Sequence, residues 1–277
     1  MSTVTPPSYF VYSSLSFYAP RHGGELPGRW FMNALVEAGQ TPGAVRQALY
    51  RMEHDGELLA RKCGREKWYR ASPYARAEIE AGLAKIFGES EEPWDGRWSL
   101  VLSRFLPEER QHRERVRSVM QVEGFATIAP GVFVHPRSSP LKRLRNAAQE
   151  LAVEHRITSF RGELAVEDDA PRLARSLWDV DDLALRYRRF LQRYSRLLRQ
   201  GSIPSPRRAF HLRFALVFDF LGVAWSDPQL PATLLPRDWP GHRARDLTRV
   251  LYERFLSGAI AHADEIYDGS PRDEERE

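Results

Sequence analysis

A helix with marked ends, followed directly by a two-strand pattern, constrains the fold of this chain more than any other feature. Thr41-Pro42 marks the start, because a hydroxyl side chain can cap a helix and proline fits its first position. Asp55-Gly56 marks the end. Strands are predicted at 58–62 and 67–71, after helices at 8–18 and 28–38. Three helices and then a hairpin predict an N-terminal winged helix-turn-helix. The stripe that this helix should bury consists of Val45, Ala48, Leu49 and Met52.

The middle of the chain alternates strands with helices. After a linker at 89–93, the order is β-α-β-β-α-β, which predicts a ferredoxin-like central domain. After the opening segment 94–98, strands are expected through 102, at 125–128 and at 132–135, with one or two more between 156 and 166, and helices are expected at 107–123 and 140–153.

The last third of the chain is almost purely helical in pattern. The acidic run 167–169 is expected to cap the first of these helices, and the final helix is expected to run unbroken to about residue 266. The predicted fold class is therefore α+β, with a winged-helix domain at 1–90, a ferredoxin-like domain at 91–170 and a helical domain at 171–277.

The segment around the marked helix carries side chains suited to DNA. The net charge of the whole chain is only +4, but positive residues clearly outnumber negative ones between 41 and 76. Arg46 can pair bidentately with guanine and Gln47 with adenine, whereas cations at the hairpin would contact phosphates. A solvated helix face and a hairpin kept soluble by charge are the alternative interpretation. The predicted DNA-binding residues are Thr41, Gly43, Arg46, Gln47, Tyr50, Arg51, Arg61, Lys62, Arg65 and Lys67.

Several classes of protein are disfavoured. Cys63 is the one cysteine, which excludes an internal disulfide and a multi-cysteine zinc site. No signal-peptide pattern or long apolar run is present, so a cytoplasmic protein without a membrane partner is expected. The histidines lack zinc-helix spacing, and neither a phosphate loop nor a nucleophile elbow occurs. We therefore predict that the protein is not an enzyme and that it has no catalytic residue, metal or cofactor.

A metal-dependent nuclease built on the central domain is the rival hypothesis. That domain resembles the CRISPR-associated ferredoxin-like nuclease, which carries a metal-binding aspartate at the end of its first strand. In this sequence the matching stretch ends in Ser103-Arg104, and neither side chain supplies a carboxylate for a divalent cation. The central domain is therefore expected to be a scaffold.

Five segments in the same order resemble the PaaX family of bacterial regulators of phenylacetate degradation. The segments are 44–52, Gly64-Arg65 with 68–70, 94–98, 130–136 and 230–241. The resemblance implies a homodimeric repressor with the three domains above, bound to double-stranded operator DNA and released by an aryl acyl-CoA such as phenylacetyl-CoA. The first helix lacks the acidic Gly-Asp usual in the family, so a regulator of the same build that senses another aromatic or acyl ligand is the alternative.

An effector of this class needs cations for the coenzyme A phosphates and an apolar pocket for the aryl group. Arginines are dense between 181 and 213, close to several aromatic residues. A charged outer face over an aromatic core would produce the same pattern. The residues predicted to bind the effector are Arg186, Arg189, Arg193, Arg207, Arg208, Phe214 and Trp225.

Overall fold

The computed structural model describes residues 6–88, 93–163, 169–199 and 204–269. Helices and two antiparallel sheets, one of three strands and one of four, confirm the predicted α+β class. The chain forms two compact units, one from Met1–Gly88, Phe190–Gly222 and Arg243–Glu277, the other from Glu89–Arg189 and Val223–His242. Among the described residues, no helix has the length and apolar character needed to cross a membrane.

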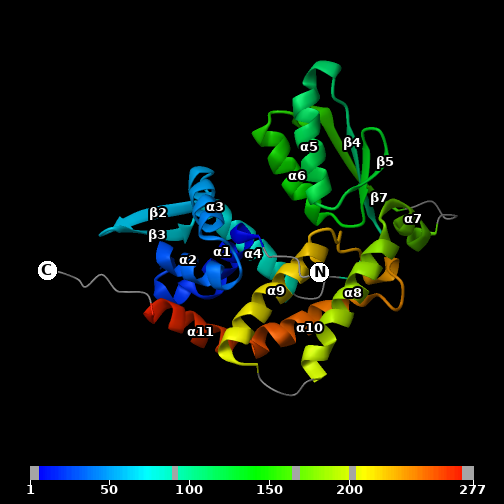
Figure 1. The fold of residues 1–277 in the computed structure, drawn as a ribbon. Helices are drawn as coiled ribbons and strands as arrows, with labels where there is room; N and C mark the ends of the chain where they lie inside the picture. The colour runs from blue at the N-terminus through cyan, green and yellow to red at the C-terminus, as the bar shows by residue number, and fades with distance from the viewer. Residues whose placement is uncertain (1–5, 89–92, 164–168, 200–203, 270–277) are drawn as a thin grey trace. The chain divides into compact units, whose positions relative to one another are not determined.

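The N-terminal part of the first unit combines four α-helices with the three-stranded sheet (Figure 1). Its elements are α1 (Pro7–Phe17), η1 (Ala19–His22), β1 (Glu25–Pro27), α2 (Gly28–Glu37), α3 (Pro42–His54), β2 (Leu58–Cys63), β3 (Glu66–Ala71) and α4 (Pro73–Phe87). The sheet order is β1-β3-β2. Strand β1 was not predicted, because three residues ending in proline carry no readable alternation. It forms by pairing with the edge of β3, where Leu26 stands opposite Tyr69.

One hydrophobic core joins this N-terminal part to the last helices of the chain. Trp30 and Phe31 of α2 are fully buried in the same cluster as Phe210, from α9 (Pro206–Ala224), and Ala263, from α11 (Leu256–Asp268). The Trp30 indole Nε1–H donates to the Ala263 carbonyl at 3.1 Å. The first unit therefore combines the predicted winged-helix domain with most of the predicted C-terminal helical domain. The division into three domains with boundaries at 90 and 170 stays a prediction.

The remaining helices are α7 (Ala170–Leu177), α8 (Val180–Arg199), η4 (Ala232–Leu234) and α10 (Pro240–Arg254). The expectation of one unbroken final helix is wrong, because Phe255 separates α10 from α11. Ser257-Gly258 follows the break, and a Cβ at Gly258 would lie 2.8 Å from the Cβ of Ala209, so this turn approaches α9 closely. Capping by Asp169 is confirmed, since its side chain accepts the Arg172 N–H at 3.2 Å. The other residues of that acidic run and linker positions 89–92 lie outside the described residues.

The second unit contains the four-stranded sheet, in the order β5-β6-β4-β7. Figure 1 shows α5 and α6 together on one face of this sheet, and Val101, Val116 and Leu144 lie in the core between them. The predicted order of strands and helices is followed, with one strand in the last position. The elements are β4 (Trp98–Ser103), η2 (Pro107–Glu109), α5 (Arg110–Val122), β5 (Ala126–Ala129), β6 (Val132–His135), α6 (Ser139–Glu150), η3 (Glu154–Arg156) and β7 (Ile157–Gly162).

Candidate nucleic-acid interface

Helix α3 is held at its start and along one side. Thr41 has an extended backbone, its hydroxyl accepts the Ala44 N–H at 3.2 Å, and Pro42 occupies the first turn, as the sequence predicts. The predicted apolar stripe is buried: Val45, Ala48, Leu49 and Met52 are each at most 5% exposed. Because this stripe packs into the core shared with α1 and α2, the opposite side of α3 has a defined orientation toward solvent.

All ten residues predicted to contact DNA are exposed. Arg46, Gln47 and Tyr50 project from the solvent side of α3, and Tyr50 keeps 70% of its surface free. The Tyr50 ring stacks on that of His54, with 6.2 Å between centroids and 9° between planes. Arg61, Lys62, Arg65 and Lys67 lie along the β2–β3 hairpin, beside α3 in Figure 1. Side chains of the type that reads base edges and side chains that neutralise phosphates thus occupy neighbouring elements.

A hollow of about 470 Å³ lies between α3, the first turn of α2 and the hairpin. Arginines from all three elements reach it. The hollow is lined by Gly28, Arg29, Met32, Arg46, Leu49, Tyr50, Glu53, Arg65, Glu66, Lys67 and Tyr69. Arg29 was not among the predicted residues, because no local signal in the sequence shows that the start of α2 approaches β3. A Cβ at Gly28 would lie 3.3 Å from the Lys67 carbonyl oxygen, so glycine permits this approach.

Ion pairs divide the cations of this surface into two groups. Lys67 Nζ contacts the Glu53 carboxylate at 2.8 Å, and this hydrogen bond raises the pKa of Lys67. Arg61 likewise pairs with Glu25 and lies over the Trp68 ring. No such ion pair to another described residue is formed by Arg46, Arg51, Lys62 or Arg65. An approaching polyanion would therefore meet these four side chains without displacing an internal carboxylate.

The residues predicted to bind an effector fall into two places. Arg193, Arg207, Arg208 and Phe214 line a cavity of about 670 Å³ in the first unit. The other three residues belong to the second unit and do not line it. Of these, Arg186 donates to the Ser226 hydroxyl at 2.7 Å, Arg189 is exposed, and Trp225 is 47% exposed.

The sequence of the chain is similar to that of a known transcriptional repressor. It is 30% identical over 253 residues to the transcriptional repressor PaaX of Escherichia coli K12, over 88% of this chain and 78% of that protein. The chain belongs to the PaaX family. This confirms the family predicted from the sequence. The model of the PaaX central Cas2-like domain matches residues 91–174, and that of the PaaX-like C-terminal domain matches residues 178–265.

A solved structure shares the fold of this PaaX-family chain. The uncharacterized protein Rv0674 from Mycobacterium tuberculosis superposes with a TM-score of 0.61, covering 95% of this chain and 99% of that one. At 21% identity, this likeness shows the fold alone.

The Cas2-like part of this PaaX-family member has no carboxylate at the end of its first strand. Strand β4 ends at Ser103, and Arg104 follows it. In the ranges that the structure describes, no group of three His, Cys, Asp or Glu side chains is placed to hold a metal ion.

Proposed function

We propose that this protein is a transcriptional repressor that binds operator DNA through a winged helix-turn-helix formed by α2, α3 and the β2–β3 hairpin. The observation that carries the proposal is the two-sided character of α3. One side is fixed in the core, while Arg46, Gln47 and Tyr50 on the other are exposed beside a cationic hairpin. An α-helix presented in this way fits the major groove of B-DNA.

The proposed contacts divide by chemistry. Arg46 and Gln47 lie in the first turns of α3, where a recognition helix meets base edges, so we assign them to base readout. Thr41 and Gly43 are exposed at the N-terminus of α3, and a helix N-terminus suits a phosphate. Lys62 and Arg65 would bind phosphates directly. Lys67 and Arg61 carry internal carboxylate partners and would contribute less.

The proposed target is an operon for catabolism of a phenylacetate-type aromatic acid, and the proposed effector is an aryl acyl-CoA such as phenylacetyl-CoA. Membership of the PaaX family and the arginine-lined cavity support this assignment. Release requires that the effector bind more tightly to a state with low operator affinity, because only differential affinity shifts an equilibrium. A different aromatic or acyl ligand is the alternative, and it is distinguished by titrating several thioesters.

The second unit is proposed as a ferredoxin-like scaffold of a homodimer. The strand order β5-β6-β4-β7 with two helices on one face is the arrangement expected for that fold. A homodimer would place two copies of α3 on two half-sites of the operator. Light scattering of the full chain measures its mass in solution, alone and bound to operator DNA. A complex whose mass corresponds to one protein chain per operator would refute the dimer.

Fluorescence anisotropy with DNA from upstream of the protein's own operon tests the DNA-binding proposal. Arg46→Ala should weaken operator binding by about 1–3 kcal/mol and relax the preference at one base pair. Arg65→Ala should weaken all sequences alike and reduce the salt dependence of binding. Arg117→Ala removes an arginine of α5 that is also exposed and serves as the matched control.

Two outcomes would refute the proposal: failure of the wild-type chain to bind promoter DNA, or equal operator binding by Arg46→Ala and Arg117→Ala. A third outcome, identical behaviour of Arg46→Ala and Arg65→Ala, concerns only the assignment of the contacts. The last result would remove the division between base and phosphate contacts.

A further inference from the structure

The cavity in the first unit has the dimensions and lining of a ligand site. Its volume of about 670 Å³ lies within the range typical of small-molecule pockets. One face of α9 forms its floor through Arg208, Leu212, Ala215 and Asp219, a stretch that spans about 16 Å at the rise of an α-helix. The cavity is therefore elongated and suits an extended ligand.

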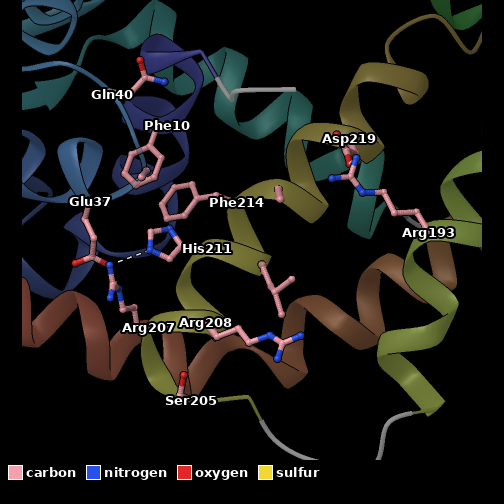
Figure 2. Close-up of a pocket in the computed structure, with 13 residues that line it drawn as sticks. Phe10, Glu37, Gln40, Arg193, Ser205, Arg207, Arg208, His211, Phe214 and Asp219 are labelled. Carbon is pink, nitrogen blue, oxygen red and sulfur yellow. Dashed lines mark hydrogen bonds and ion pairs between the residues drawn. The ribbon is translucent and has the colours of Figure 1, made fainter. Parts of the chain in front are cut away.

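The middle of the cavity is apolar. Phe10 and Phe214 stack with 3.8 Å between ring centroids and 8° between planes, and both line the cavity (Figure 2). Leu212 and Ala215 continue this apolar surface along α9. Both rings are only 3% exposed, so a flat aromatic or acyl group placed here would bury hydrophobic area chiefly against the partly exposed Leu212 and Ala215 beside them.

Charged groups occupy the ends. At one end, Arg193 pairs with Asp219 at 2.7 Å. At the other end, Arg207 Nε lies 3.0 Å from Glu37. Arg208 forms no ion pair with any residue that the structure describes, and Figure 2 shows it extending away from Glu37. The lining thus contains one arginine more than the two carboxylates neutralise, and that excess favours an anion.

Glu37 connects this cavity to the DNA-binding helix. Its Oε1 atom lies 3.0 Å from Arg207 Nε, 2.9 Å from His211 Nε2 and 2.8 Å from His262 Nε2. Partial burial acts to raise the pKa of Glu37, but these hydrogen bonds outweigh it and the pKa is lowered. The carboxylate is therefore ionised at neutral pH and holds the end of α2 to α9 and α11.

The segment between α2 and α3 forms part of the cavity wall. Glu37 is the last residue of α2, and Ala38 and Gln40, which also line the cavity, precede the Thr41 cap of α3. A ligand in the cavity would thus touch the turn that sets the position of α3.

We propose that this cavity binds a ligand that combines an aromatic or acyl group with an anionic group, and that the anion contacts Arg208 and replaces Glu37 as the partner of Arg207. Loss of this pairing removes one of the three hydrogen bonds that hold the end of α2, while those to His211 and His262 remain. The turn before α3 loosens, and operator affinity falls. The inference rests on the proposed repressor function for its DNA readout, but ligand binding alone tests the site.

Isothermal titration calorimetry of the full chain without DNA is the first test. The probes are phenylacetyl-CoA, phenylacetate, coenzyme A and inorganic phosphate. Binding of the thioester but not of phenylacetate assigns the anion to coenzyme A phosphates, and binding of phenylacetate assigns it to a carboxylate. Arg208→Gln should weaken the probe that binds by at least about tenfold, since a charged hydrogen bond is lost. Arg243→Gln, an exposed arginine of α10 outside the cavity, should leave binding unchanged.

Two further variants test the mechanism. Glu37→Gln removes the competing carboxylate, so the ligand should bind several-fold more tightly while operator binding of the ligand-free protein weakens. Ala215→Phe fills the apolar floor, keeps every charge and should abolish ligand binding while preserving operator binding. The ratio of ligand affinities with and without operator should equal the ratio of operator affinities with and without ligand.

The results separate failure of this site from failure of the proposed function. If the chain binds operator but every probe binds Arg208→Gln and Ala215→Phe as it binds wild type, the cavity assignment is overturned and the repressor proposal stands. If the variants behave as expected in calorimetry but wild type does not bind operator, the repressor proposal fails and the ligand site stands. Binding of no probe to the wild type, or weaker ligand binding by Glu37→Gln, overturns the inference.

Discussion

Acidification should destabilise the second unit through one buried histidine. His135 of β6 is 2% exposed, and burial lowers its pKa from 6.5 to about 4. The Nδ1 atom accepts the Arg137 N–H at 3.0 Å, and the ring also hydrogen-bonds the backbone of Pro228. The neutral ring is therefore satisfied in the fold. Protonation at Nδ1 would remove the acceptor for Arg137 and place a charge in the core.

The sign and size of the effect follow from this lowered pKa. Above pH 6.5 the ring is neutral in both the folded and the unfolded chain, and its contribution to stability is fully present. As the pH falls from 6.5 toward 4, the unfolded chain binds a proton that the folded chain rejects, so the free energy of unfolding decreases. At about 1.4 kcal/mol per pH unit, the total loss is roughly 3 kcal/mol.

Urea unfolding followed by tryptophan fluorescence, between about pH 7.5 and about pH 4.5, measures this loss. His135→Asn keeps an acceptor for Arg137 but has no titrating group, so most of the decrease should disappear in this variant. His155→Asn removes an exposed histidine from the same unit and should retain the wild-type decrease. Equal pH dependence in wild type and His135→Asn would refute the argument, because other titrating groups would then account for the whole effect.

Two smaller predictions concern the unit that is proposed to bind DNA. Thr41→Ala removes the side-chain acceptor for the Ala44 N–H and should lower the free energy of unfolding by about 1 kcal/mol. Thr41→Ser keeps a hydroxyl acceptor, so its free energy of unfolding should stay close to that of the wild type. Thermal denaturation of the two variants checks this, and equal melting temperatures would contradict the capping role. Lys62→Ala should reduce the salt dependence of operator binding by about one counterion, and Lys67→Ala by less, because Lys67 is already paired with Glu53. Anisotropy titrations at several salt concentrations compare them, and a larger effect of Lys67→Ala would contradict the assignment.

The sequence by itself determined the local elements that matter for DNA binding. The Thr41 cap, the apolar stripe of α3 and the hairpin after Asp55-Gly56 all depend on residues within a few positions of each other, so their signals are readable in one dimension. The order of elements in the second unit was readable for the same reason. Exposure of Arg46 and Gln47 followed from the stripe opposite them.

Only the tertiary structure decided which distant residues meet. Glu37 lies 174 residues before His211 and 225 before His262 in the sequence, yet both imidazole rings contact its Oε1 atom. Nothing in their local sequence marks this, because a histidine on a helix face looks the same whether it faces solvent or a carboxylate. Arg186 and Arg207 likewise looked alike as cations of one dense run, yet Arg207 lines the cavity and Arg186 does not. Contacts of this kind depend on how helices pack around a shared core, and helical periodicity specifies the buried face of a helix but not its neighbour.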